Sequence, residues 1–211
     1  LVALFLGISF VLLIGSNEEL ILKSTGTKLL QIGIVILGLT ISSSGAINLT
    51  TKYFPYISLF VIVIFLVGFI ASKVLRIDTK LSILLVSGTA ICGATAMAAI
   101  SPLIKAKPKD LLTSLGVIFI FNAIAIAMLP IIANHIEMSS EQFGSWVALA
   151  VHDTSSVIGA AMSFNDNSVE TATTLKLGRT LWLIPLIIIL GVVNKDNKST
   201  KSIFPIFVLA F

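Results

Sequence analysis

Long apolar runs separated by short polar gaps are the feature that most constrains this chain. The clearest run covers residues 56–75 and carries no charge before Lys73. A helix needs about 20 apolar residues to cross the hydrocarbon core of a bilayer, and this run has that length. The chain is 56% hydrophobic and 11% charged, whereas an ordinary soluble domain has roughly 25% charged residues. The sequence therefore excludes a soluble globular enzyme, a disordered tail and a nucleic-acid-binding domain.

The spacing of the runs predicts an all-α fold, a polytopic transmembrane helical bundle. No polar gap is long enough for a soluble domain, so residues 1–211 are predicted to form a single transmembrane domain. The expected spans are residues 1–14 (partial), 29–47, 56–75, 81–104, 111–134, 145–164, 175–193 and 203–211 (partial). The two terminal runs are too short to cross alone. We therefore expect a piece of a longer membrane protein, truncated at both ends.

The orientation in the membrane stays open at this level. If every run crosses, eight Lys and Arg residues fall on one side and six on the other. That difference is too small for the rule that cytoplasmic loops are enriched in Lys and Arg. A broken or re-entrant segment would change the count.

The expected span at residues 81–104 contains a stretch, SGTAICGATAMAA at residues 87–99, in which nearly every side chain is small. Small side chains let helices pack closely, and Gly88, Cys92 and Ala96 would share one helix face. Alternatively the helix is unwound here, because each glycine costs about 1 kcal/mol relative to alanine in a helix. Broken helices near the membrane midplane bind substrate in many transporters. The candidate substrate-binding residues in this stretch are Gly88, Thr89, Cys92, Gly93 and Thr95.

Near the middle of the expected span at residues 145–164 lies a second unusual stretch, VHDTSSVIG. An aspartate at the centre of a spanning helix costs roughly 2.5–3.5 kcal/mol on insertion scales, so His152 and Asp153 should face a cavity or a partner. They are candidates for coupling to a proton or a cation. Ser155 and Ser156 join the candidate substrate-binding set. The alternative is a buried polar cluster that holds helices together.

Two basic residues, Lys176 and Arg179, open the expected span at residues 175–193. They are three positions apart and share a helix face. Either they snorkel to the membrane interface with Trp182 as an aromatic anchor, or they attract anions at a pore mouth. Pro185 is expected to kink this helix. Asn122, a lone amide at residues 111–134, is expected to form an interhelical hydrogen bond.

Other chemical signatures are absent from the sequence. There is no phosphate-binding loop, no HExxH motif and no paired-cysteine metal site, and the single cysteine excludes a disulfide scaffold. We therefore expect no enzyme activity, no cofactor and no metal site, and any transport would draw its energy from an ion gradient.

Four motifs occur along the chain in a fixed order: LLQIGIVILG at residues 29–38, ICGA at 91–94 with Pro102 and Lys105 following, VHD at 151–153, and KLGR at 176–179 before Pro185. Together they resemble the YeiH-type membrane proteins, the proposed sulfate exporter family. The resemblance implies a relationship to the cation–proton antiporter and bile-acid symporter-like folds, which are inverted repeats with crossed, broken helices. It also implies a multi-pass protein of the bacterial inner membrane. Gln31 departs from the arginine usual in the family, and Ser156 from a frequent glutamine.

These observations predict a secondary transporter that moves a small inorganic or organic anion, sulfate on the family resemblance. Its expected partners are membrane lipid, that anion and a coupling proton or sodium ion; a homo-oligomer is left open, and nucleic acid is excluded. An ionised Asp153 would repel sulfate, so either it is protonated or ion-paired, or the substrate is a cation. The alternatives are therefore a sodium- or proton-coupled cation antiporter and a non-transporting membrane component.

Overall fold

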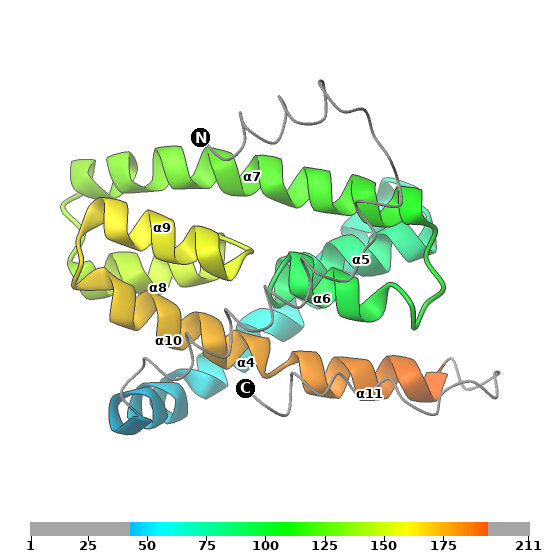
Figure 1. The fold of residues 1–211 in the computed structure, drawn as a ribbon, viewed down its shortest axis with the longest axis horizontal. Coiled ribbons are helices and arrows are strands. Elements are labelled where there is room, and N and C mark those ends of the chain that lie inside the picture. The colour runs from blue at the N-terminus through cyan, green and yellow to red at the C-terminus, as the bar shows by residue number, and fades with distance from the viewer. Residues whose placement is uncertain (1–42, 194–211) are drawn as a thin grey trace, which may run out of the picture. The chain divides into compact units, whose positions relative to one another are not determined.

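Helices make up the fold of residues 43–193, the part of the chain that the structure, a computed structural model, describes. These residues belong to one compact unit, and no strand occurs among them. The helices, shown in Figure 1, are α4 Ser43–Val74, α5 Thr79–Ala90, α6 Ala94–Ile100, α7 Pro108–His135, α8 Ser140–Ala150, α9 Thr154–Phe164, α10 Ser168–Thr180 and α11 Leu183–Val193. The all-α bundle predicted from the sequence is confirmed.

Three segments are long and apolar enough to cross a membrane: Lys52–Val74 in α4, Pro108–His135 in α7, and Ser168–Val193, which joins α10 and α11. They contain the runs expected at residues 56–75, 111–134 and 175–193. The last segment is interrupted at residues 181–182. These residues lie four and three positions before Pro185, and a proline ring clashes with the helix backbone about one turn before it. The runs expected at 1–14 and 203–211, and most of 29–47, lie outside the described residues.

The run at residues 81–104 does not form one continuous helix. Gly88 and Met97 are nine positions apart, which is about 13 Å along a continuous helix. In the structure, however, a Cβ built on Gly88 would lie 2.3 Å from the methyl carbon of Met97. At the outer ends of α5 and α6, the Lys80 ammonium donates to the carbonyl oxygen of Lys105 at 2.7 Å. The chain therefore turns back at residues 91–93, and α5 and α6 form a re-entrant hairpin.

A second re-entrant hairpin replaces the span expected at residues 145–164. The rings of Phe143 in α8 and Phe164 at the end of α9 stack with their centroids 4.3 Å apart, so both arms start and finish at the same end of the molecule. The turn lies at residues 151–153. Neither of these two runs therefore forms one continuous helix. Hydropathy alone does not separate one long helix from two short arms.

The two hairpins enter the bundle from opposite ends of α7 and meet tip to tip (Figure 1). α7 has 28 residues and a length of roughly 42 Å. The arms α5 and α8 have 12 and 11 residues, or roughly 17 Å each, about half of a hydrocarbon core that is about 30 Å thick. An arm of this length that starts at the membrane surface would end near the middle of the hydrocarbon core.

Local signals start and stop the arms. Asp78 caps α5 by accepting from the backbone N–H of Lys80 at 2.9 Å. Ser139 and Gln142 form a reciprocal capping box at the start of α8, which satisfies backbone donors that the first turn leaves unpaired. Pro108 stands in the first turn of α7, where its missing N–H costs nothing.

Each hairpin has its own apolar core. The first core packs α5 and α6 against α4, α7 and α11, and includes Ile57, Leu84, Met97, Ile118 and Ile187. The second packs α8 and α9 against α7 and α10, and includes Ala133, Phe143, Val157, Ala160 and Ala172. The outward faces of α4 and α7 expose large apolar side chains such as Leu59, Leu66, Ile120 and Ile131, as expected for helices that face lipid.

Close approach of α8 to α10 depends on Gly144. A Cβ at this position would lie 2.6 Å from the backbone oxygen of Ser168. We expect Gly144→Ala to lower the free energy of unfolding by about 1–3 kcal/mol, the usual cost of overpacking, in a thermal melt of the full-length protein in detergent. Gly159→Ala in α9 is the matched control, because nothing lies within 4 Å of its Cβ, and it should be neutral or slightly stabilising. Equal midpoints for the two variants would contradict this packing.

Candidate functional site

The tips of the two hairpins touch through their backbones. Gly93 has a φ of 63° and a ψ of −122°, a conformation open essentially to glycine alone. Its N–H donates to the carbonyl oxygen of Gly88 at 2.8 Å. A Cβ on Gly93 would lie 3.3 Å from the carbonyl carbon and oxygen of His152 in the other tip. Glycine therefore makes both the turn and the tip-to-tip contact.

Arg179, on α10, binds both hairpins at once. Its Nε donates to the carbonyl oxygen of Ala90 at 3.2 Å and its Nη2 to that of Thr89 at 2.6 Å, both at the end of α5. Its Nη1 donates to the carbonyl oxygens of Ala148 and Leu149 in α8, at 2.8 and 2.9 Å. The guanidinium also lies 5.1 Å from the ring centroid of Phe60 in α4, within the range of a cation–π interaction.

Lys176 repeats this arrangement one helical turn earlier. Its ammonium donates to the carbonyl oxygen of Val151 at 2.9 Å and to that of Ile91 at 3.3 Å, one in each tip. Lys176 and Arg179 are both fully buried. The structure therefore joins the two hairpin tips through two cations on one face of α10.

The physical reason lies in the ends of the half-helices. The last carbonyls of a helix have no partner within the helix, and its C-terminus carries a partial negative charge. The C-termini of α5 and α8 both end in the interior, where an unpaired carbonyl is costly. All six hydrogen bonds that Lys176 and Arg179 donate within residues 43–193 go to such backbone carbonyls, and none goes to a carboxylate. The hydrogen-bond acceptors of these two side chains therefore carry partial negative charges rather than full ones.

The carboxylate of Asp153 is hydrogen-bonded by residues that follow it closely in the chain. It accepts from the hydroxyls of Ser155 and Ser156 and from the backbone N–H of Ser156, so it caps α9. The negative charge of an N-cap aspartate also interacts favourably with the positive end of the helix dipole. The structure therefore brings together these three residues of the predicted site.

The backbone of His152 is held by α7. Its N–H donates to the side-chain oxygen of Asn122 at 3.0 Å, which is the interhelical hydrogen bond expected for Asn122. The side-chain nitrogen of Asn122 and the Nδ1 of His152 are buried and have no hydrogen-bond partner among the described residues. The second tip thus has two buried polar atoms whose hydrogen-bonding capacity is unused within the described residues.

The small-residue stretch combines the two interpretations left open by the sequence. It is unwound at residues 91–93, and Gly88 is also a site of close packing, against Met97 and Ile118. Cys92 and Thr95 are buried beside the turn, and Thr89 contributes its carbonyl oxygen to Arg179. A role for these residues in binding a substrate stays a prediction.

Lys176 and Arg179 do not occupy the exposed position expected from the sequence. We predicted basic side chains at a pore mouth or snorkelling to the interface, whereas both are buried on the hairpin tips. The sequence could not reveal this, because their partners are carbonyls that any residue carries. Arg179 bonds to residues 30–31 and 89–90 positions earlier in the chain.

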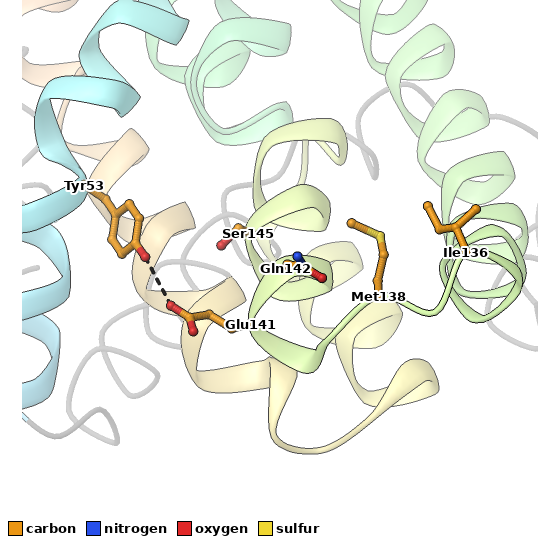
Figure 2. A pocket seen from close by; sticks show the side chains of 6 residues that line it. All are labelled: Tyr53, Ile136, Met138, Glu141, Gln142 and Ser145. Atoms are coloured by element: carbon orange, nitrogen blue, oxygen red, sulfur yellow. Dashed lines mark hydrogen bonds between the residues drawn. The ribbon is translucent and has the colours of Figure 1, made fainter.

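A cleft between α4 and α8 opens at the base of the second hairpin (Figure 2). It has a volume of about 500 Å³ and is lined by Tyr53, Ile136, Met138, Glu141, Gln142 and Ser145. The Tyr53 hydroxyl donates to a carboxylate oxygen of Glu141 at 3.1 Å across it. Sequence reasoning missed this pair, which is 88 positions apart and belongs to no motif.

An apolar pocket of about 280 Å³ shares Tyr53 and Ser145 with this cleft, and is also lined by Tyr56, Ile57, Leu149 and Leu175. The carbonyl oxygen of Leu149 is one of those bound by Arg179, and Leu175 precedes Lys176. The apolar pocket therefore lies beside residues that adjoin the bonds of the two buried basic side chains.

Fold and site together define a multi-pass helical membrane protein with two re-entrant hairpins that meet at a pair of buried cations. The family model described as "Conserved hypothetical protein 698" matches residues 1–211. The chain belongs to this family, and the resemblance to the YeiH-type membrane proteins is confirmed.

Relatives from several bacteria carry the description "UPF0324 membrane protein". The one from Bacteroides thetaiotaomicron is 40% identical over 211 residues, which cover 100% of this chain and 64% of the relative. The one from Photobacterium profundum is 40% identical over 213 residues, with the same two coverages. The one from Clostridium tetani is 34% identical over 211 residues, covering 90% of this chain and 61% of the relative. The chain thus spans less than two thirds of the length of these relatives, and no solved structure matches it.

Proposed function

We propose that the protein is a secondary transporter that moves a small anion, of the sulfate type, across the bacterial cytoplasmic membrane at the cost of an ion gradient. The observation that carries this proposal is the meeting of two re-entrant hairpins at two buried cations with no direct carboxylate partner. Non-helical backbone at membrane depth is tolerated where it is buried in protein or lines a water-filled cavity. Half-helices that end at the midplane are a recurring feature of transporter binding sites.

The charge at the tips favours an anion over a cation. Lys176 and Arg179 bring two positive charges, and Asp153 brings one negative charge that is bonded to its own helix start. This arrangement answers the objection that Asp153 would repel an anion, since the cap and the nearby cations offset its charge. The unpartnered nitrogens of Asn122 and His152 add hydrogen-bonding capacity for the solute.

The cleft at Tyr53 and Glu141 offers an access route to the hairpin tips. The apolar pocket that shares Tyr53 and Ser145 with it is lined by Leu149 and Leu175, the residues beside the bonds of Arg179 and Lys176. In the proposed cycle, the Tyr53–Glu141 hydrogen bond opens when solute enters or leaves on this side.

The test is a solid-supported-membrane current measurement on the full-length protein reconstituted in liposomes. We expect sulfate, sulfite or a small organic anion to produce a current that depends on a pH or sodium gradient. Asp153→Asn, which keeps an acceptor for the helix cap, should leave anion-induced current but remove its dependence on the gradient.

Other results of the same measurement would replace the proposal. Cation-dependent current that vanishes in Asp153→Asn, with no response to any anion, would indicate a sodium- or proton-coupled cation antiporter. No current with any solute would indicate a non-transporting membrane component.

A further inference from the structure

The two hairpins change which loops share a side of the membrane. Because α5 and α6 return to the end where they started, the segment before α5 and the segment after α6 lie together, as the Lys80–Lys105 hydrogen bond shows directly. The base of the α8–α9 hairpin, with the turns at residues 136–139 and 165–167, lies at the other end of α7. Counting every apolar run as a crossing assigns these loops to the wrong sides.

Basic residues gather at one of these two ends. Within residues 43–193, the end at the base of the α5–α6 hairpin carries six: Lys73, Arg76, Lys80, Lys105, Lys107 and Lys109. The end at the base of the α8–α9 hairpin carries one, Lys52, which lies next to the Tyr53–Glu141 pair. The same end carries four acidic residues: Glu137, Glu141, Asp166 and Glu170. Lys176 and Arg179 are bonded inside the fold and belong to neither end.

We propose that the base of the α5–α6 hairpin lies on the cytoplasmic side and rests on anionic lipid head groups. Lys and Arg in short loops next to membrane spans are retained on the cytoplasmic side. The anionic lipids of that surface attract such residues. The α8–α9 hairpin and the cleft at Tyr53 then open on the outer side. This inference does not require transport, since it rests on the hairpin topology and the charges alone.

Cysteine labelling of the full-length protein in spheroplasts tests the orientation. Lys107 and Asp166 are both exposed and stand at opposite ends, so Lys107→Cys and Asp166→Cys are matched reporters. The native Cys92 is buried, and its background is measured in the parent protein. With a membrane-impermeant maleimide, Asp166→Cys should react in intact spheroplasts as well as after permeabilisation. Lys107→Cys should reach less than about a tenth of its permeabilised labelling, as expected for a single orientation.

Two results would overturn the inference. In one, Lys107→Cys reacts in intact spheroplasts and Asp166→Cys only after permeabilisation. In the other, both react equally in intact spheroplasts, which would indicate two orientations. A further variant tests the cause: replacing Lys105, Lys107 and Lys109 by Gln in the Asp166→Cys protein should lower its labelling in intact spheroplasts, whereas Lys52→Gln should not.

Discussion

Arg179→Met should lower the free energy of unfolding of the full-length protein by about 3 kcal/mol or more. A buried polar group left without a partner costs about 1–3 kcal/mol, and this substitution leaves four carbonyls at the ends of α5 and α8 without their donor. Methionine roughly fills the volume of the side chain, so the loss reports on hydrogen bonds and charge rather than on a cavity. The measurement is the thermal midpoint in detergent.

Two controls accompany this variant. Lys107→Met removes a positive charge from an exposed position and should change stability by no more than about 0.5 kcal/mol. Arg179→Lys should fall between the wild type and Arg179→Met, because an ammonium cannot reproduce the planar fork of donors that spans two helices. If Arg179→Met melts with the wild type, the cation does not join the hairpins.

Gly93→Ala should destabilise the protein through both the backbone conformation and the contact between the two tips. The backbone at Gly93 has a φ of 63° and a ψ of −122°, and a side chain held in such a conformation costs about 1–3 kcal/mol. The added methyl group would also lie 3.3 Å from the backbone of His152, so the two tips must move apart. We expect a loss of about 2 kcal/mol or more on these grounds, measured by the same melt.

The matched control is Gly116→Ala in α7. Nothing lies within 4 Å of a Cβ at Gly116, and alanine is the better helix former by about 1 kcal/mol, so this variant should be at least as stable as the wild type. A Gly93→Ala protein as stable as Gly116→Ala would mean that the first tip does not need glycine's backbone conformation.

Several features of the site could be predicted from the sequence. The two unusual stretches contain the hairpin tips at residues 91–93 and 151–153. The glycines in one and the ionisable side chains in the other are each unfavourable in a plain lipid-facing helix. The interhelical bond of Asn122 also follows from its chemistry, since a lone amide in an apolar helix needs a partner.

Other features could not be predicted. The partners of Arg179 and Lys176 are backbone carbonyls, which leave no mark in the residue pattern. The Tyr53–Glu141 hydrogen bond joins segments 88 positions apart. Neither residue belongs to a recognisable motif, so only their placement by α4 and α8 brings them together.

By itself, the sequence determined that this chain is a helical membrane protein, that its apolar segments fall where they do, and that two of them contain stretches unfavourable in a plain lipid-facing helix, because hydropathy and helix propensity act locally. Only the tertiary structure decided that the two interrupted segments turn back instead of crossing. The reason is physical: an apolar run of about 24 residues has the same hydropathy whether it forms one spanning helix or two short arms. The choice depends on a few backbone torsions around Gly93 and residues 151–153, and on cations from α10 that bind the arm ends. That choice also places the basic loops on one side of the membrane.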